Sequence, residues 1–246
     1  RSESGASGAP SRIVIPSRSV VPAAASARRD YEFTPGMKSA GPFSLNFDAI
    51  EVWNGKQTIE AETVFKDWIR FLRLGYRFTG TGNSDSHRLV SQEAGYPRNY
   101  VSVPDDRPES LDGKTVAASV RAGNVLVTSG PVIDWWIFDS PAAGFDSAPT
   151  GHAGPLKMRV RVRAAPWCDV TTVEVLRNGD LVKTIPVAAS TNLVRVDSSW
   201  DEPLADAAGK FYQIRVCGEK PLDDVVPPDG NRHMIPLAFT NPVWIR

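Results

Sequence analysis

The chain has 246 residues, 41% of them hydrophobic and 23% charged, which is the composition of a folded globular protein and not of a disordered one. Lys plus Arg equals Asp plus Glu at 28 each, so no net field attracts nucleic acid or an anionic membrane. No apolar run reaches the ~20 residues of a membrane-spanning helix. We therefore expect neither nucleic acid nor membrane as a partner.

Residues 1–40, rich in Ser, Ala, Pro and Arg, predict an extended arm or linker.

Residues 41–150 carry an alternation of strand and helix signals that predicts an α/β region. An apolar run up to Asn54 predicts a buried strand, and apolar residues at helical spacing then predict a helix that stops at Gly75. A second strand near Thr81 runs into a Gly-rich turn, and a helix capped by Ser110 leads to a third strand. Sites in parallel α/β folds form where such strands end.

Residues 151–246 alternate apolar and polar side chains, which predicts a small antiparallel β-sandwich. Asn178-Gly179 predicts the tight turn of a hairpin, because both residue types accept positive φ angles. Cys168 and Cys217 lack the spacing of a zinc or redox motif. They are either buried thiols or, in a secreted or periplasmic protein, one disulfide, and the sequence leaves both interpretations open.

The segment after the second predicted strand ends on Asp85 and His87, two residues apart. Residues i and i+2 of an extended segment point to the same side, so this carboxylate and imidazole can approach one metal ion together. The alternative is a polar loop in which Asp85 caps a turn and His87 lies in solvent. Two ligands do not make a metal site by themselves, so the spacing alone does not decide between the two.

Five segments, in the same order along the chain, carry a resemblance to a known family. They are FDAIEVWNG at 47–55, GTGNSDSH at 80–87, GYPRNYV at 95–101, AGNVLVTSGP at 122–131 and AFTNPV at 238–243. Together they resemble the CehA/McbA-like branch of the PHP superfamily of metal-dependent hydrolases, named for polymerase and histidinol phosphatase. The resemblance covers roughly residues 40–246 and implies the C-terminal part of a distorted (β/α) barrel followed by the β-sandwich. It also implies that divalent zinc, manganese or iron activates water against a phosphoester, or another ester, amide or carbamate, of a small-molecule substrate.

The resemblance assigns roles to individual residues. Asp85 and His87 match the last metal-binding motif of the family. Glu51 and Asn54 match the strand before it and would border the pocket, with Asn54 facing substrate or capping the next turn, and with Glu51 touching metal or held in a polar network. Arg98 would steady an anionic substrate oxygen, unless it is an exposed structural arginine. No residue is a convincing general acid.

The histidine count departs from the family pattern. The early motifs of the family supply a His-x-His pair, further histidines and a bridging carboxylate, whereas this chain has His87, His152 and His233 alone. Where relatives carry an Asn-His-Pro-Arg-like element, residues 15–18 read Ile-Pro-Ser-Arg. Because each ion needs about four ligands, we expect the others on an N-terminal segment outside this chain, such as a fragment of the same precursor, and the first residue, Arg1, agrees with that.

A second hypothesis is a degenerate, non-catalytic PHP-like module that acts in binding or as a scaffold. Its β-sandwich would contact a carbohydrate polymer or another protein. The chain has seven tryptophans, which either fill the core or stack on sugars.

Overall fold

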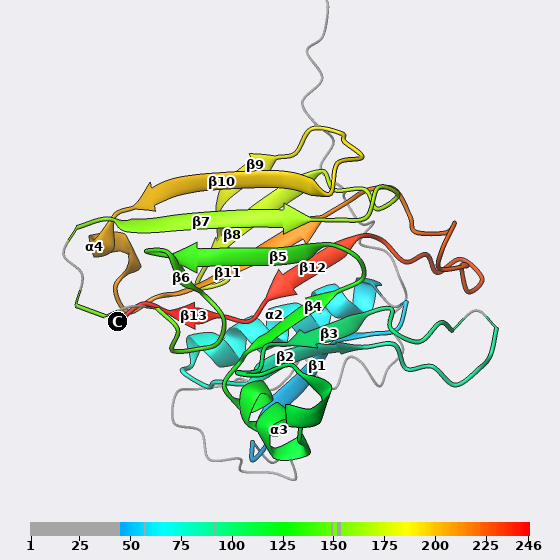
Figure 1. The fold of residues 1–246 in the computed structure, drawn as a ribbon, viewed down its shortest axis with the longest axis horizontal. Helices are drawn as coiled ribbons and strands as arrows, with labels where there is room; N and C mark the ends of the chain where they lie inside the picture. Colours follow the sequence, from blue (N-terminus) through cyan, green and yellow to red (C-terminus); the bar gives the residue numbers. More distant parts are fainter. Residues whose placement is uncertain (1–44, 57, 91, 149, 152–153) are drawn as a thin grey trace, which may run out of the picture. The chain divides into compact units, whose positions relative to one another are not determined.

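The computed structural model describes residues 45–246 except 57, 91, 149 and 152–153, and the described residues belong to one compact unit (Figure 1). The predicted arm at 1–40 and His152 lie outside them. The first elements are β1 (Ala49–Asn54), α2 (Thr58–Arg73), β2 (Thr79–Asn83), β3 (Arg98–Val101), a 3-10 helix η1 (Pro108–Ser110), α3 (Gly113–Arg121), β4 (Val125–Thr128), β5 (Val132–Ile137) and β6 (Ser140–Pro141). There follow β7 (Leu156–Arg163), β8 (Thr172–Arg177), β9 (Asp180–Pro186), β10 (Val194–Glu202), α4 (Leu204–Ala207), β11 (Phe211–Cys217), β12 (Leu237–Thr240) and β13 (Val243–Trp244).

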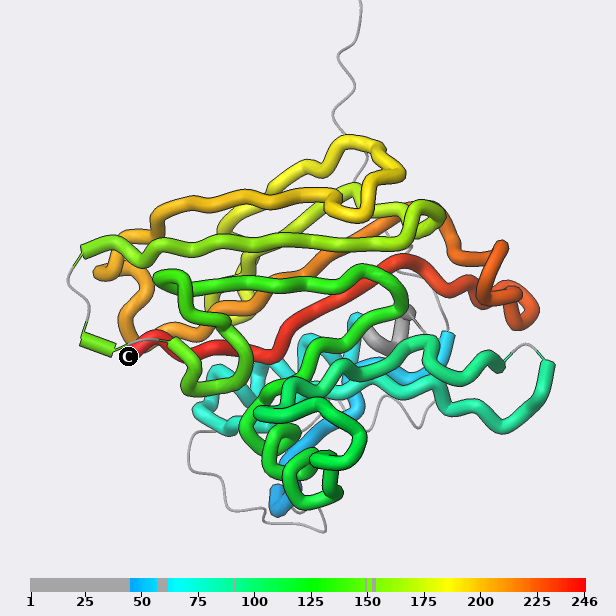
Figure 2. Tube along the Cα trace, in the orientation of Figure 1, coloured from blue at the N-terminus to red at the C-terminus, as the bar shows by residue number. Residues whose placement is uncertain are grey.

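The strands form three sheets. β1 and β2 pair in parallel, a second sheet has the order β10-β7-β5-β6, and the third has the order β3-β4-β12-β11-β8-β9 with β13 also paired to β11. Strands from both sides of residue 150 share the two larger sheets, because β5 pairs with β7 and β4 with β12. Figure 2 shows this second pairing as the green trace of β4 beside the red trace of β12.

The expected (β/α) barrel is wrong. Among the described residues the sheets are mostly antiparallel, none of them closes into a barrel, and the structure is 15% helical. The strand–helix alternation leads to parallel pairing once, in β1-α2-β2. The strand that follows α3, β4, instead pairs antiparallel with β3 and β12. Alternation along the chain is a local property, whereas the choice of strand partner depends on segments far away in sequence.

The helix predicted to end at Gly75 is confirmed as α2, and Gly75 follows it with φ +88°. Its buried stripe includes Trp68 and Phe65, whose rings pack against Phe239 of β12 at centroid distances of 5.8 and 5.4 Å. The indole N–H of Trp68 donates to the Phe78 carbonyl at 2.7 Å. α2 therefore joins the parallel strands to the seven-stranded sheet through one buried aromatic cluster.

The predicted Gly-rich turn is the strand β2, and packing explains two of its glycines. A Cβ atom on Gly80 would lie 2.7 Å from the ring of Trp68, and one on Gly82 would lie 2.4 Å from Cγ1 of Val127. Real Cβ contacts are not this short, so a side chain at either position displaces a buried neighbour. The glycines let β2 lie close to α2 on one side and to β4 on the other.

Two asparagine side chains take the place of a strand along the edge of β2 that faces away from β1. Asn241 Nδ2 donates to the carbonyl of Gly80 at 3.0 Å and its Oδ1 accepts from the Gly80 N–H at 2.7 Å. Asn99 makes the same pair of bonds with Gly82, at 2.8 and 2.9 Å. Side-chain amides carry one donor group and one acceptor like a peptide, so they satisfy β2 where it meets the antiparallel sheet.

Other local predictions have mixed outcomes. The hairpin turn is confirmed, since Asn178 and Gly179 join β8 to β9 with φ +51° and +81°. The cap of α3 was assigned wrongly to Ser110, because the side chain of Asp112 accepts from the backbone N–H groups of Lys114 and Thr115. No helix within the described part of the chain is long and apolar enough to cross a membrane.

Both cysteines are free thiols. Burial raises the pKa of the Cys168 thiol to about 11 and that of Cys217 to about 12. Because the thiolate is the reactive form, neither side chain has the character of a nucleophile or of a metal-binding thiolate near neutral pH.

Candidate functional site

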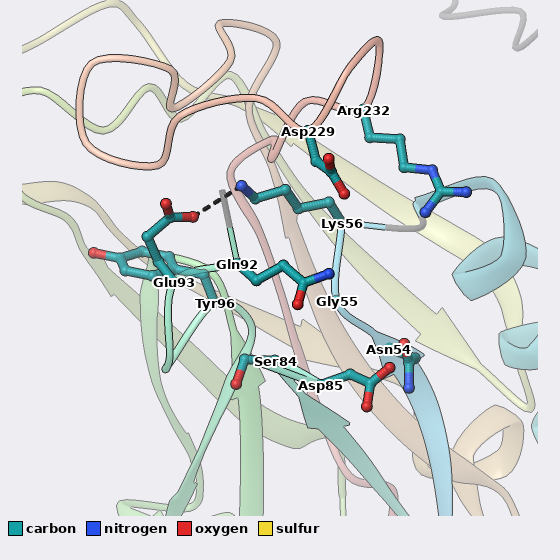
Figure 3. A pocket seen from close by; sticks show the side chains of 10 residues that line it. All are labelled: Asn54, Gly55, Lys56, Ser84, Asp85, Gln92, Glu93, Tyr96, Asp229 and Arg232. Carbon is teal, nitrogen blue, oxygen red and sulfur yellow. Dashed lines mark hydrogen bonds and ion pairs between the residues drawn. The ribbon is translucent and has the colours of Figure 1, made fainter. Parts of the chain in front are cut away.

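The candidate site lies where the two parallel strands end side by side, with Asn54 of β1 in register with Asn83 of β2. Gly55 turns the chain immediately after β1 with φ +51°, and its N–H donates to the Asn83 carbonyl at 2.8 Å. A polar pocket of about 50 Å³ opens at this point. Its lining residues, drawn in Figure 3, are Asn54, Gly55, Lys56, Ser84, Asp85, Gln92, Glu93, Tyr96, Asp229 and Arg232.

Asp85 and His87 lie together just beyond β2. The Asp85 Oδ1 and His87 Nε2 atoms are 2.7 Å apart, and the two side chains are 48% and 72% exposed. Asp85 has φ +49°, in the left-handed region, so the segment here is bent and not extended as the spacing argument assumed. The carboxylate and imidazole nevertheless converge, and Asp85 lines the pocket beside Asn54 (Figure 3).

These two residues have the chemistry of metal ligands and could form part of a coordination sphere. A carboxylate oxygen and an imidazole nitrogen are suitable ligands for zinc, manganese or iron, and both side chains are open to a bound ion. Among residues 45–246 as described, however, no group of three or more His, Cys, Asp and Glu side chains is placed to hold an ion. A second pair of this type, His233 Nδ1 and Asp223 Oδ2 at 2.9 Å, lies in the segment between β11 and β12. At the pocket, the described residues therefore offer two candidate ligands and no complete site.

Glu51 is held in a polar network next to the pocket. Its Oε1 accepts from Asn83 Nδ2 at 2.6 Å and its Oε2 from Asn54 Nδ2 at 3.1 Å. The Oδ1 of Asn83 in turn accepts from Asn99 Nδ2 at 3.1 Å. Asn54 lines the pocket while its amide nitrogen is bound to Glu51, so the carboxylate orients the one side chain of the network that the pocket exposes.

Arg98, the candidate for binding an anionic oxygen, is engaged within its own segment. Its Nη1 donates to the Gly95 carbonyl at 3.1 Å, and its guanidinium lies 5.2 and 5.5 Å from the ring centroids of Tyr96 and Tyr100. It is absent from the lining of the pocket, whose cations are Lys56 and Arg232. Sequence reasoning missed both, although Lys56 directly follows the Asn54-Gly55 turn and could have been noticed there.

Lys56 is a largely buried cation of the pocket, with a side chain 8% exposed. Its Nζ lies 2.8 Å from Glu93 Oε2 and also donates to the carbonyl of Pro227. Burial opposes ionisation of Glu93, but the hydrogen bond and charge of Lys56 outweigh it and hold the pKa of this carboxyl below its usual value. The Glu93 carboxyl therefore stays ionised at neutral pH.

The far wall of the pocket comes from the C-terminal region. Asp229 and Arg232 form an antiparallel bridge through two backbone hydrogen bonds of 3.0 Å, and both line the pocket (Figure 3). No local sequence signal links this turn to Asp85, because the two are more than a hundred residues apart. The lining carries two cations and three carboxylates, a formal excess of one negative charge that favours a cation in the pocket.

Comparison with known proteins finds no family model, no curated protein and no solved structure that matches this chain. The resemblance to PHP hydrolases and its role assignments therefore stay predictions. The alternative of a sugar-binding module also stays a prediction. Trp53, Trp68 and Trp135 are buried, whereas Trp136 has two arginine guanidinium groups over its ring and Trp167 is 45% exposed.

Proposed function

We propose that this chain supplies Asp85 and His87 as two ligands of a divalent metal ion in a hydrolase related to the PHP superfamily. The ion is zinc, manganese or iron, and the remaining ligands come from outside the described residues. The substrate is a small molecule with a phosphoester, or with another ester, amide or carbamate bond. Bound metal in this class of enzyme supplies an activated water.

One observation carries the proposal: a carboxylate and an imidazole converge at the carboxyl ends of the parallel pair β1 and β2, at the edge of a polar pocket. Carboxyl ends of parallel strands are where α/β proteins gather ligand-binding side chains. The negative excess of the pocket supports a cation at this place, and a divalent ion would reverse that excess and admit an anionic substrate group. Glu51 would hold Asn54 toward that group through their hydrogen bond.

The test is a Mn²⁺ titration of the labelled chain, with the imidazole C–H signals of the histidines followed by NMR. Paramagnetic broadening reports weak binding at each ring separately. We expect His87 to broaden at the lowest Mn²⁺ concentration, and Asp85→Ala to raise the concentration needed by about tenfold, because one of two ligands is lost.

The second His–Asp pair is the matched control. Asp223→Ala removes the partner of His233 at the same kind of contact and should leave the broadening of His87 unchanged. Equal broadening of His87 and His233 in the wild type, or an unchanged response of His87 in Asp85→Ala, would contradict the proposal. A non-catalytic module predicts that result, since it has no reason to prefer one exposed pair over the other.

A further inference from the structure

Lys56 joins three segments that are far apart in sequence. It leaves the turn after β1, binds Glu93 in the segment between β2 and β3, and donates to the carbonyl of Pro227 in the segment between β11 and β12. Its side chain is 8% exposed and that of Glu93 is 28% exposed, so the pair is largely removed from water. Figure 3 shows Lys56 reaching across the pocket to Glu93.

The residue next to Glu93 connects this ion pair to the candidate metal ligands. Gln92 Oε1 accepts a hydrogen bond from the backbone N–H of His87 at 2.9 Å. Glu93 is thereby the anchored end of a short loop that begins at Asp85 and closes on itself through His87 and Gln92. Without the Lys56–Glu93 ion pair, the contacts left to the loop would include that of His87 with Asp85. An interaction between such exposed side chains is weak in water.

We propose that Lys56 is a positioning residue that, through Glu93 and Gln92, holds residues 85–87 in the conformation in which Asp85 and His87 converge. This role matters for catalysis only if the proposed function holds, whereas the contacts that position the loop do not depend on it. The Lys56 ammonium and the Glu93 carboxylate compensate each other's charge at 2.8 Å, and removal of either side chain takes this compensation from a site that is partly shielded from water. We therefore expect Glu93 to turn to water in such a variant and the loop to loosen.

A change at Lys56 should therefore reach His87 through Glu93 and the neighbouring Gln92, which accepts from the His87 N–H. Lys56→Met should speed hydrogen exchange of the His87 amide, which is bound to Gln92, and weaken Mn²⁺ binding at His87. Groups that orient metal ligands through hydrogen bonds change metal affinity 10- to 100-fold, and an indirect contact should fall at the lower end, about tenfold. Glu93→Gln should act in the same way, and the double variant should be no worse than either single one.

The experiment measures amide exchange and the Mn²⁺ titration of His87 in the full chain. Lys56→Arg keeps the charge and donors and should recover most of the wild-type behaviour. Arg177→Met is the control, because it breaks another partly buried ion pair, 3.0 Å from Glu202, and neither residue lines the pocket. It should lower stability without changing the His87 amide or its Mn²⁺ response.

Two outcomes separate the two proposals. If Asp85→Ala weakens Mn²⁺ binding at His87 as proposed while Lys56→Met and Glu93→Gln leave both readouts at wild-type values, Lys56 has no positioning role and the metal proposal survives. If the Lys56 and Glu93 variants speed His87 exchange while Asp85→Ala leaves Mn²⁺ binding unchanged, the positioning role holds and the metal proposal fails. Since Glu93→Gln provides a milder change, a poorly folded Lys56→Met does not prevent the test.

Discussion

Replacing Asn241 with alanine is the sharpest test of how the parallel strands are attached to the rest of the protein. Asn241 is only 2% exposed. Its side chain makes three hydrogen bonds, two with Gly80 and one of 2.8 Å to the Val125 carbonyl. The Val125 carbonyl keeps a second donor, the backbone N–H of Asn241 at 3.3 Å. Two buried groups, the N–H and C=O of Gly80, therefore lose their partner.

An orphaned buried group costs about 1–3 kcal/mol, so we expect Asn241→Ala to lower the free energy of unfolding by about 3–5 kcal/mol. Urea denaturation, followed by tryptophan fluorescence, measures this as a lower midpoint with an unchanged slope. Asn99→Ala is the matched control: it removes the equivalent bonds to Gly82, but the site is part-buried and water can replace them. We expect a cost of about 1–2 kcal/mol there. An Asn241→Ala cost below about 1 kcal/mol, or one smaller than for Asn99→Ala, would refute the reasoning.

Three further predictions concern packing, thiol chemistry and pH. Gly82→Ala should destabilise by about 1–3 kcal/mol because its methyl group would overlap a buried valine of β4, and a neutral result in urea denaturation would contradict this packing. Cys168 and Cys217 should react with iodoacetamide at pH 8 at least about 100-fold more slowly than a free cysteine, since pKa values of about 11 and 12 leave almost no thiolate. Rapid labelling of the folded protein would show this prediction to be wrong. The pKa of Glu93 is lower in the folded protein than its ordinary value of 4.5. The pairing with Lys56 therefore stabilises the protein fully at a pH above 4.5, and this stabilisation is lost as the pH falls through the pKa of the folded state. The melting temperature of Glu93→Gln should therefore lie below that of the wild type at pH 6 and approach it toward pH 3, and a gap that is constant with pH would argue against the ion pair.

Local signals predicted several elements correctly. The periodic apolar residues around Trp68 identify α2 because one helix face carries them, whatever that face later contacts. Asn178-Gly179 identifies a hairpin because the turn itself requires positive φ. β3 and β5 were not predicted, although Trp135 of β5 is buried, since a short apolar run does not show by itself whether it is a strand.

The candidate site was also predicted only in part, because sequence patterns report neighbouring residues and not partners from distant segments. The proximity of Asp85 and His87 follows from two residues of spacing, and the structure brings them together even though the backbone there is bent. Arg98 was assigned by resemblance, while its actual partners are the Gly95 carbonyl and two tyrosine rings. Lys56 and Arg232 line the pocket instead, and Arg232 arrives from a turn that no local pattern associates with the strand ends.

By itself, the amino-acid sequence determined where helix, turn and alternating strands form, and it placed a carboxylate and an imidazole two residues apart. The tertiary structure alone decided that β4 pairs with β3 and β12 and not with β2, that Asn99 and Asn241 close the edge of β2, and that Lys56 meets Glu93. Periodicity and turn geometry are properties of neighbouring residues. Strand pairing, buried amide contacts and ion pairs across a pocket depend on segments up to 161 residues apart, which only the folded chain brings into contact.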